Sequence, residues 1–181
     1  LPGDRTTPLG VYGASKLGGE LAVATSGVRY AVLRSSWVVS AHGNNFVKTM
    51  LRLAGERDSV SVVDDQHGCP TGATDLAAAA ATIAIEMADN LDRSSGIWHF
   101  SNAGPTTWRR FAEAIMAGSV ARGGPSATVL PVATADFPTP ARRPASSVLD
   151  CAAIGGDFGI TPRPWQDALD DILDALIGPK A

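Results

Sequence analysis

The sequence of 181 residues has few cysteines, no long apolar run and no excess of basic charge, and each of these absences argues against a class of protein. It has two cysteines, Cys69 and Cys151, which lie too far apart for a metal-type spacing, and this favours a reduced, cytoplasmic setting. It has no run of about 18 apolar residues, so no membrane span is expected. It has no excess of basic charge, with 15 Lys and Arg against 18 Asp and Glu, which argues against a nucleic-acid partner. Its hydrophobic content of 45% nevertheless suffices for a buried core.

The order of apolar and polar residues predicts helices that alternate with strands. Helical spacing covers residues 12–26, 46–54, 74–89, 107–120 and 165–177. Short β-branched or alternating runs, which predict strands, cover residues 28–33, 59–63, 96–101 and 129–132. Expected helix caps are Asn44 or Asn45, Thr71 or Thr74, and Thr106 or Thr107. This alternation is typical of an α/β fold with parallel strands.

The sharpest local pattern is Tyr12-Gly13-Ala14-Ser15-Lys16, at the start of the first predicted helix. Residues four apart share a helix face, so the Tyr12 phenol and the Lys16 ammonium can both contact a ligand bound on that face. A phenol ionises at about pH 10, but a fixed ammonium nearby favours the phenolate. The pair therefore suits proton donation to a carbonyl oxygen while hydride reaches its carbon. The alternative is an exposed helix start with a solvated lysine.

Longer blocks of sequence extend this pattern. Residues 8–20, Pro-Leu-Gly-Val-Tyr-Gly-Ala-Ser-Lys-Leu-Gly-Gly-Glu, resemble the catalytic helix of the extended short-chain dehydrogenases/reductases. Further blocks, in the same order along nearly the whole chain, resemble one branch, the dTDP-4-dehydrorhamnose reductases. These blocks are residues 33–39, 43–51, 65–71, 75–77, 96–100, 107–112, 137–141, 143–144, 147–150 and Trp165.

The resemblance implies an α/β fold: the C-terminal part of a Rossmann-type parallel sheet with helices, plus a small C-terminal α+β substrate lobe. Residues 1–125 would be the remainder of the NAD(P)-binding domain with substrate-lobe insertions, and residues 126–181 a C-terminal substrate-binding segment. No glycine-rich turn of the kind that cradles a pyrophosphate is found. Together with the initial Leu1, this predicts a C-terminal fragment that exposes apolar strand faces and is inactive alone.

The resemblance also implies an activity, the reduction of dTDP-4-dehydro-L-rhamnose to dTDP-L-rhamnose by NADPH or NADH for surface polysaccharide. Tyr12 would donate the proton, and Lys16 would hold the nicotinamide ribose and lower the pKa of Tyr12. A dTDP-sugar is thus the expected ligand, and a homodimer of the full-length enzyme stays open. Two alternatives also stay open: a non-catalytic reductase-like binding or regulatory subunit, and another nucleotide-sugar epimerase or dehydratase.

Four further positions are implied to bind substrate, each with a structural alternative. Trp37 would pack against the dTDP-sugar, or anchor a loop. Asn44 and Asn45 would contact the diphosphate, or cap the next helix. Arg143, with Arg142 beside it, would bind phosphate oxygens through its guanidinium, or lie solvated on the surface.

Two positions depart from the family pattern. Some family members bind a divalent ion across a dimer interface through glutamates, and Thr74 stands where one of these would fall, so no metal is expected there. Val39 stands where the family usually has tyrosine, which removes one hydrogen-bonding group near the substrate. His67 and Cys69 share a predicted turn, and the lack of a third nearby ligand favours a loop over a metal site.

Overall fold

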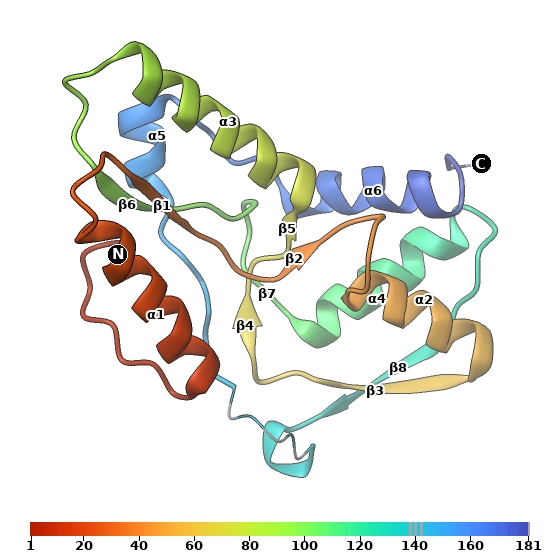
Figure 1. The fold of residues 1–181 in the computed structure, drawn as a ribbon. Coiled ribbons are helices and arrows are strands. Elements are labelled where there is room, and N and C mark those ends of the chain that lie inside the picture. Colours follow the sequence, from red (N-terminus) through yellow and green to blue (C-terminus); the bar gives the residue numbers. More distant parts are fainter. Residues whose placement is uncertain (138, 140, 142, 181) are drawn as a thin grey trace.

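Helices and short strands alternate along the chain in a computed structural model that describes residues 1–137, 139, 141 and 143–180 (Figure 1). The helices are α1 (Val11–Ala24), α2 (Phe46–Glu56), α3 (Ala73–Asp89), α4 (Trp108–Val120), α5 (Ala152–Phe158) and α6 (Trp165–Leu176), with a 3-10 turn at Thr134–Asp136. The strands are β1 (Ala31–Arg34), β2 (Val38–Val39), β3 (Ser59–Val63), β4 (His67–Gly68), β5 (Thr71–Gly72), β6 (Gly96–His99), β7 (Thr106–Thr107) and β8 (Thr128–Val132).

The strands pair two by two. β1 pairs with β6, β2 with β5 and β3 with β8, all parallel, whereas β4 and β7 run antiparallel. In the register of the first pair, Arg34 lies opposite His99, so the carboxyl ends of β1 and β6 coincide. The predicted α/β fold with parallel strands is confirmed.

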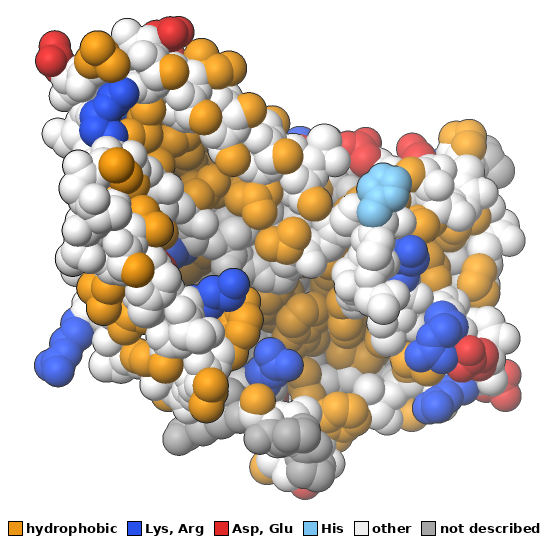
Figure 2. Space-filling model, viewed as in Figure 1, with side chains coloured by type: hydrophobic (Ala, Val, Ile, Leu, Met, Phe, Trp, Pro, Cys, Tyr) orange, Lys and Arg blue, Asp and Glu red, His pale blue; other side chains and the backbone are white. Residues whose placement is uncertain are grey.

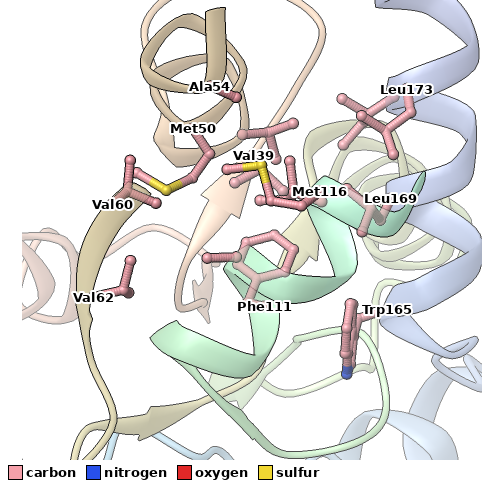
Figure 3. Close-up of a cluster of buried hydrophobic side chains, with 14 residues drawn as sticks. Val39, Met50, Ala54, Val60, Val62, Phe111, Met116, Trp165, Leu169 and Leu173 are labelled. Carbon is pink, nitrogen blue, oxygen red and sulfur yellow. The ribbon is translucent and has the colours of Figure 1, made fainter. Parts of the chain in front are cut away.

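Two clusters of buried side chains hold these elements together. The larger lies among α2, β3, α4 and α6 and surrounds Phe111, which is fully buried (Figure 3). In α4, Phe111 and Ile115 are four residues apart and Ala112 and Met116 follow each of them, so one face of the helix is buried. The second cluster joins α3, α5, β1 and β6. Residues 126–181 contribute to both clusters, because α6 packs in the first and α5 in the second.

Two of the three predicted helix caps are confirmed, and the third is wrong. Asn45 caps α2 by accepting a hydrogen bond from the Lys48 N–H, and Thr107 caps α4 in the same way from Arg110. The cap predicted at Thr71 or Thr74 is wrong, because the residue before α3 is Gly72 and none of the described side chains caps the helix. Thr71 lies instead in β5, fully buried.

Several element boundaries also differ from the prediction. The first strand begins at Ala31 rather than residue 28, since Val28 is exposed. His67, which is predicted to share a turn with Cys69, instead begins β4. The two-residue strands and the seven-residue α5 are too short to show a periodic pattern in the sequence. None of the helices in the described ranges is long and apolar enough to cross a membrane.

An open groove lies between β1 and α3. It has a volume of about 430 Å³, and its walls are mainly apolar, with Leu33 on β1 and Ile83 and Met87 on α3. Figure 2 shows hydrophobic side chains gathered in a hollow of this face of the molecule. Among the described residues, no predicted site residue lines this groove, so the candidate site lies elsewhere.

Candidate active site

The two predicted catalytic residues lie side by side on the first turn and a half of α1. The helix begins at Val11 after the extended Gly10, so Tyr12 is its second residue and Lys16 follows one turn later. The Lys16 Nζ atom lies 5.5 Å from the centroid of the Tyr12 ring. The Tyr12 side chain is 76% exposed, which leaves the pair open to a ligand.

One turn beyond Lys16, Glu20 links α1 to β1. Arg34 donates from Nε to Oε1 of Glu20 at 2.9 Å and from Nη2 to Oε2 at 2.6 Å, a two-point ion pair. These hydrogen bonds lower the pKa of Glu20 and raise that of Arg34. Glu20 lies in the block that resembles the catalytic helix, but the sequence contains no sign that its partner is Arg34.

Buried polar atoms without partners gather near the carboxyl ends of β1 and β6. His99 is 4% exposed, and within the described residues neither of its ring nitrogens, nor the Ser35 hydroxyl, has a hydrogen-bond partner. Burial, and next the charge of Arg34, lower the pKa of His99. The carboxyl ends of parallel strands are where open α/β sheets bind ligands, and buried polar groups without a hydrogen-bond partner are uncommon in proteins. Sequence reasoning found no role for His99.

Trp37 is held in an aromatic cluster. Its ring stacks on Trp108 with centroids 3.6 Å apart and planes 13° from parallel, and Phe46 lies beside Trp108 at 4.6 Å. Its φ of 47° is in the left-handed region, which is costly for a bulky side chain. A Cβ at Gly68 would overlap the Trp37 indole, so only glycine fits there. The anchoring alternative for Trp37 is thus visible in the structure, and its contact with substrate stays a prediction.

Within the described residues, no hydrogen bond joins the other predicted substrate residues to one another. Asn45 is engaged as a cap, and its Nδ2 also donates to the Ser40 carbonyl at 2.7 Å. Asn44 and Arg143 are exposed, and Arg142 lies outside the described residues. In Figure 1 the chain that follows Arg143 runs up to α5, with α1 on one side and β4 on the other. His67 holds this segment through backbone hydrogen bonds with residues 145 and 147.

The three positions that the sequence relates to a metal, Thr74, His67 and Cys69, differ in their exposure. Thr74 is exposed in the first turn of α3, and His67 is exposed beside the segment just described. Cys69 is buried, and burial raises the pKa of its thiol. In the part of the chain that the structure describes, no group of three His, Cys, Asp or Glu side chains is placed to share an ion.

Parallel strand pairs, crossover helices and a Tyr-x-x-x-Lys pair at a helix start define this chain as part of a Rossmann-type α/β fold. The chain belongs to the dTDP-4-dehydrorhamnose reductase family, since the model of the RmlD substrate binding domain matches residues 1–177.

Individual relatives agree with this membership. A dTDP-4-dehydrorhamnose reductase of Sinorhizobium fredii is 43% identical over 175 residues, which are 96% of this chain and 59% of the relative. The crystal structure of the Clostridium acetobutylicum dTDP-4-dehydrorhamnose reductase matches with a TM-score of 0.84 at 34% identity, over 96% of this chain and 58% of that one. The Bacillus anthracis reductase, solved in complex with NADP, matches with a TM-score of 0.82 at 34% identity, over 94% and 57%. The chain therefore spans less than two thirds of the length of these relatives.

Proposed function

We propose that this chain is the proton-donating and substrate-binding part of an enzyme that reduces dTDP-4-dehydro-L-rhamnose to dTDP-L-rhamnose with NADPH or NADH. The product would serve surface-polysaccharide synthesis. The observation that carries the proposal is the exposed Tyr12–Lys16 pair on one face of α1, with Nζ 5.5 Å from the phenol ring centroid. Membership of the reductase family supports the substrate.

Tyr12 and Lys16 fit the nicotinamide end of NADPH or NADH. Within the described ranges, the Lys16 ammonium faces the Tyr12 ring and takes part in no ion pair, which leaves its protons available to ribose hydroxyls. A glycine-rich turn for the pyrophosphate is not found in the 181 residues. When bound, NADPH or NADH supplies the hydride. We propose that the 181 residues alone do not turn over, because they supply only the nicotinamide end of that site.

Within this proposal, the chain's own groups handle the proton and the substrate. The Tyr12 hydroxyl donates its proton to the C4 oxygen of the sugar, and the Lys16 charge stabilises the phenolate that is left. The proposal assigns the rest of the substrate to Trp37, Asn44 and Arg143. Since the Asn45 side chain caps α2, the proposal gives it a supporting role at most. Residues 126–181 would supply the C-terminal share of the substrate site, and no metal is assigned to the Thr74 position.

The test is to express the full-length reading frame and follow NADPH or NADH oxidation at 340 nm with dTDP-4-dehydrorhamnose. The matched variants are Tyr12→Phe and Tyr30→Phe, which change the two tyrosines of the chain one at a time. Absorbance should fall with the unchanged protein and with Tyr30→Phe. A folded protein that binds the sugar nucleotide but oxidises neither cofactor would refute the reductase proposal and favour a binding subunit.

A further inference from the structure

Helix α1 is attached to the described remainder of the protein by very little buried surface. None of its 14 residues is buried, and none belongs to either buried cluster. Val11, Tyr12 and Leu21 are all more than half exposed. An isolated helix of about 12–15 residues is marginal in water, so each contact that joins α1 to another element bears on its stability.

The Glu20–Arg34 ion pair joins α1 to the last residue of β1. Both side chains are only about a fifth exposed, at 18% for Glu20 and 20% for Arg34. Among the described side chains of α1, Glu20 is the one that forms an ion pair with another element. Arg34 also donates to the Pro2 carbonyl at 3.3 Å, so it ties the segment before α1 to the same point.

Glu20 lies on the same side of α1 as the proposed catalytic pair, so the Glu20–Arg34 ion pair bears on the proposed chemistry. Tyr12, Lys16 and Glu20 follow one another at intervals of four residues, so they lie along one side of the helix. Arg34 is fixed in turn, because it is the last residue of β1 and its carbonyl accepts from the Phe100 N–H at 2.9 Å. The ion pair therefore joins the side of α1 that carries Tyr12 and Lys16 to the end of β1.

We propose that Glu20 and Arg34 are positioning residues, which hold the Tyr12–Lys16 face of α1 in place beside the carboxyl ends of β1 and β6. The pair does not touch the reacting atoms, and it acts through the helix. This inference rests on the proposed function where it concerns catalysis, but the attachment of α1 can be tested without any activity.

The first experiment measures amide hydrogen exchange in the protein expressed from the full-length reading frame. Glu20→Gln should speed exchange of the α1 amides about ten-fold or more, since charge-assisted two-point hydrogen bonds are lost, while the α3 and α4 amides stay protected. The matched control is Glu56→Gln, which breaks the exposed Arg52–Glu56 pair within α2 and should leave α1 unchanged. The exchanged pair Glu20→Arg with Arg34→Glu should recover part of the protection.

Three results would overturn the inference: rapid exchange of α1 in the unchanged chain, unchanged protection of α1 in Glu20→Gln, or loss of protection in α3 and α4 together with α1. The last result would make the pair a general stability element. Arg34→Lys, which keeps the charge but loses the two-point geometry, gives a milder test and should speed α1 exchange less than Glu20→Gln does.

The second experiment measures turnover of the same full-length protein. Glu20→Gln should lower kcat by about ten-fold or more with the KM for the sugar nucleotide within a few-fold, and should have little further effect in the Tyr12→Phe background. An equal loss in both backgrounds would contradict a role through Tyr12. If the unchanged enzyme shows no reductase activity, the proposed function fails while the exchange experiment still decides whether the pair positions α1.

Discussion

Replacement of Trp37 by alanine measures how far this residue is a structural anchor. The substitution removes the stack on Trp108, at a 3.6 Å centroid separation, and leaves a gap above Gly68. An aromatic pair contributes about 1 kcal/mol beyond its buried area, and truncation of a large aromatic residue costs about 3–5 kcal/mol when it is fully buried. Because Trp37 is only partly buried, we expect a loss of about 3 kcal/mol in the free energy of unfolding.

Urea unfolding, followed by circular dichroism, tests this value. The control is Phe137→Ala, which removes an aromatic side chain that is 47% exposed and should change the free energy of unfolding by less than about 1 kcal/mol. A cost below about 1 kcal/mol for Trp37→Ala would refute the anchoring role. Trp37 would then be, as the sequence resemblance implies, chiefly a contact for the sugar nucleotide.

Three other perturbations test the surroundings of the site. Gly68→Ala should destabilise the protein by about 2 kcal/mol, because a Cβ there overlaps the Trp37 indole; a neutral result in urea unfolding would mean that the ring moves easily. Asn45→Ala should cost about 1 kcal/mol through loss of the α2 cap, and Asn45→Asp, measured in the same way, should restore most of it. The Glu20 pKa is lowered in the folded protein, so its stabilisation of α1 is fully present above the unfolded value of about 4.3 and is lost as the pH falls through the folded value. Hydrogen exchange of α1, corrected for the intrinsic pH dependence, should show this loss, and Glu20→Gln should show none.

Local signals in the sequence predicted the longer elements correctly. The helical spacing of residues 107–120 predicted α4, and of the two expected caps, Thr106 and Thr107, it is Thr107 that caps the helix. The predicted pairing of Tyr12 with Lys16 agrees with their positions in α1, since a spacing of four residues specifies one helix face without tertiary structure.

Contacts between distant segments could not be predicted. The stacking of Trp37 on Trp108 joins residues that are far apart in sequence, and the left-handed backbone at Trp37 has no signal in a single sequence. The pairing of Glu20 with Arg34 depends on how α1 lies against β1. His99, whose buried ring nitrogens have no hydrogen-bond partner among the described residues, was missed for the same reason, because its burial results from tertiary structure.

The central claim, that Tyr12 is the proton donor of a reductase, is tested most directly by the turnover of Tyr12→Phe in the full-length reading frame. The substitution removes the hydroxyl and keeps the ring, so sugar-nucleotide binding should stay within a few-fold while kcat falls by about 100-fold or more. Oxidation of NADPH or NADH with dTDP-4-dehydrorhamnose at an unchanged rate in Tyr12→Phe would contradict the account.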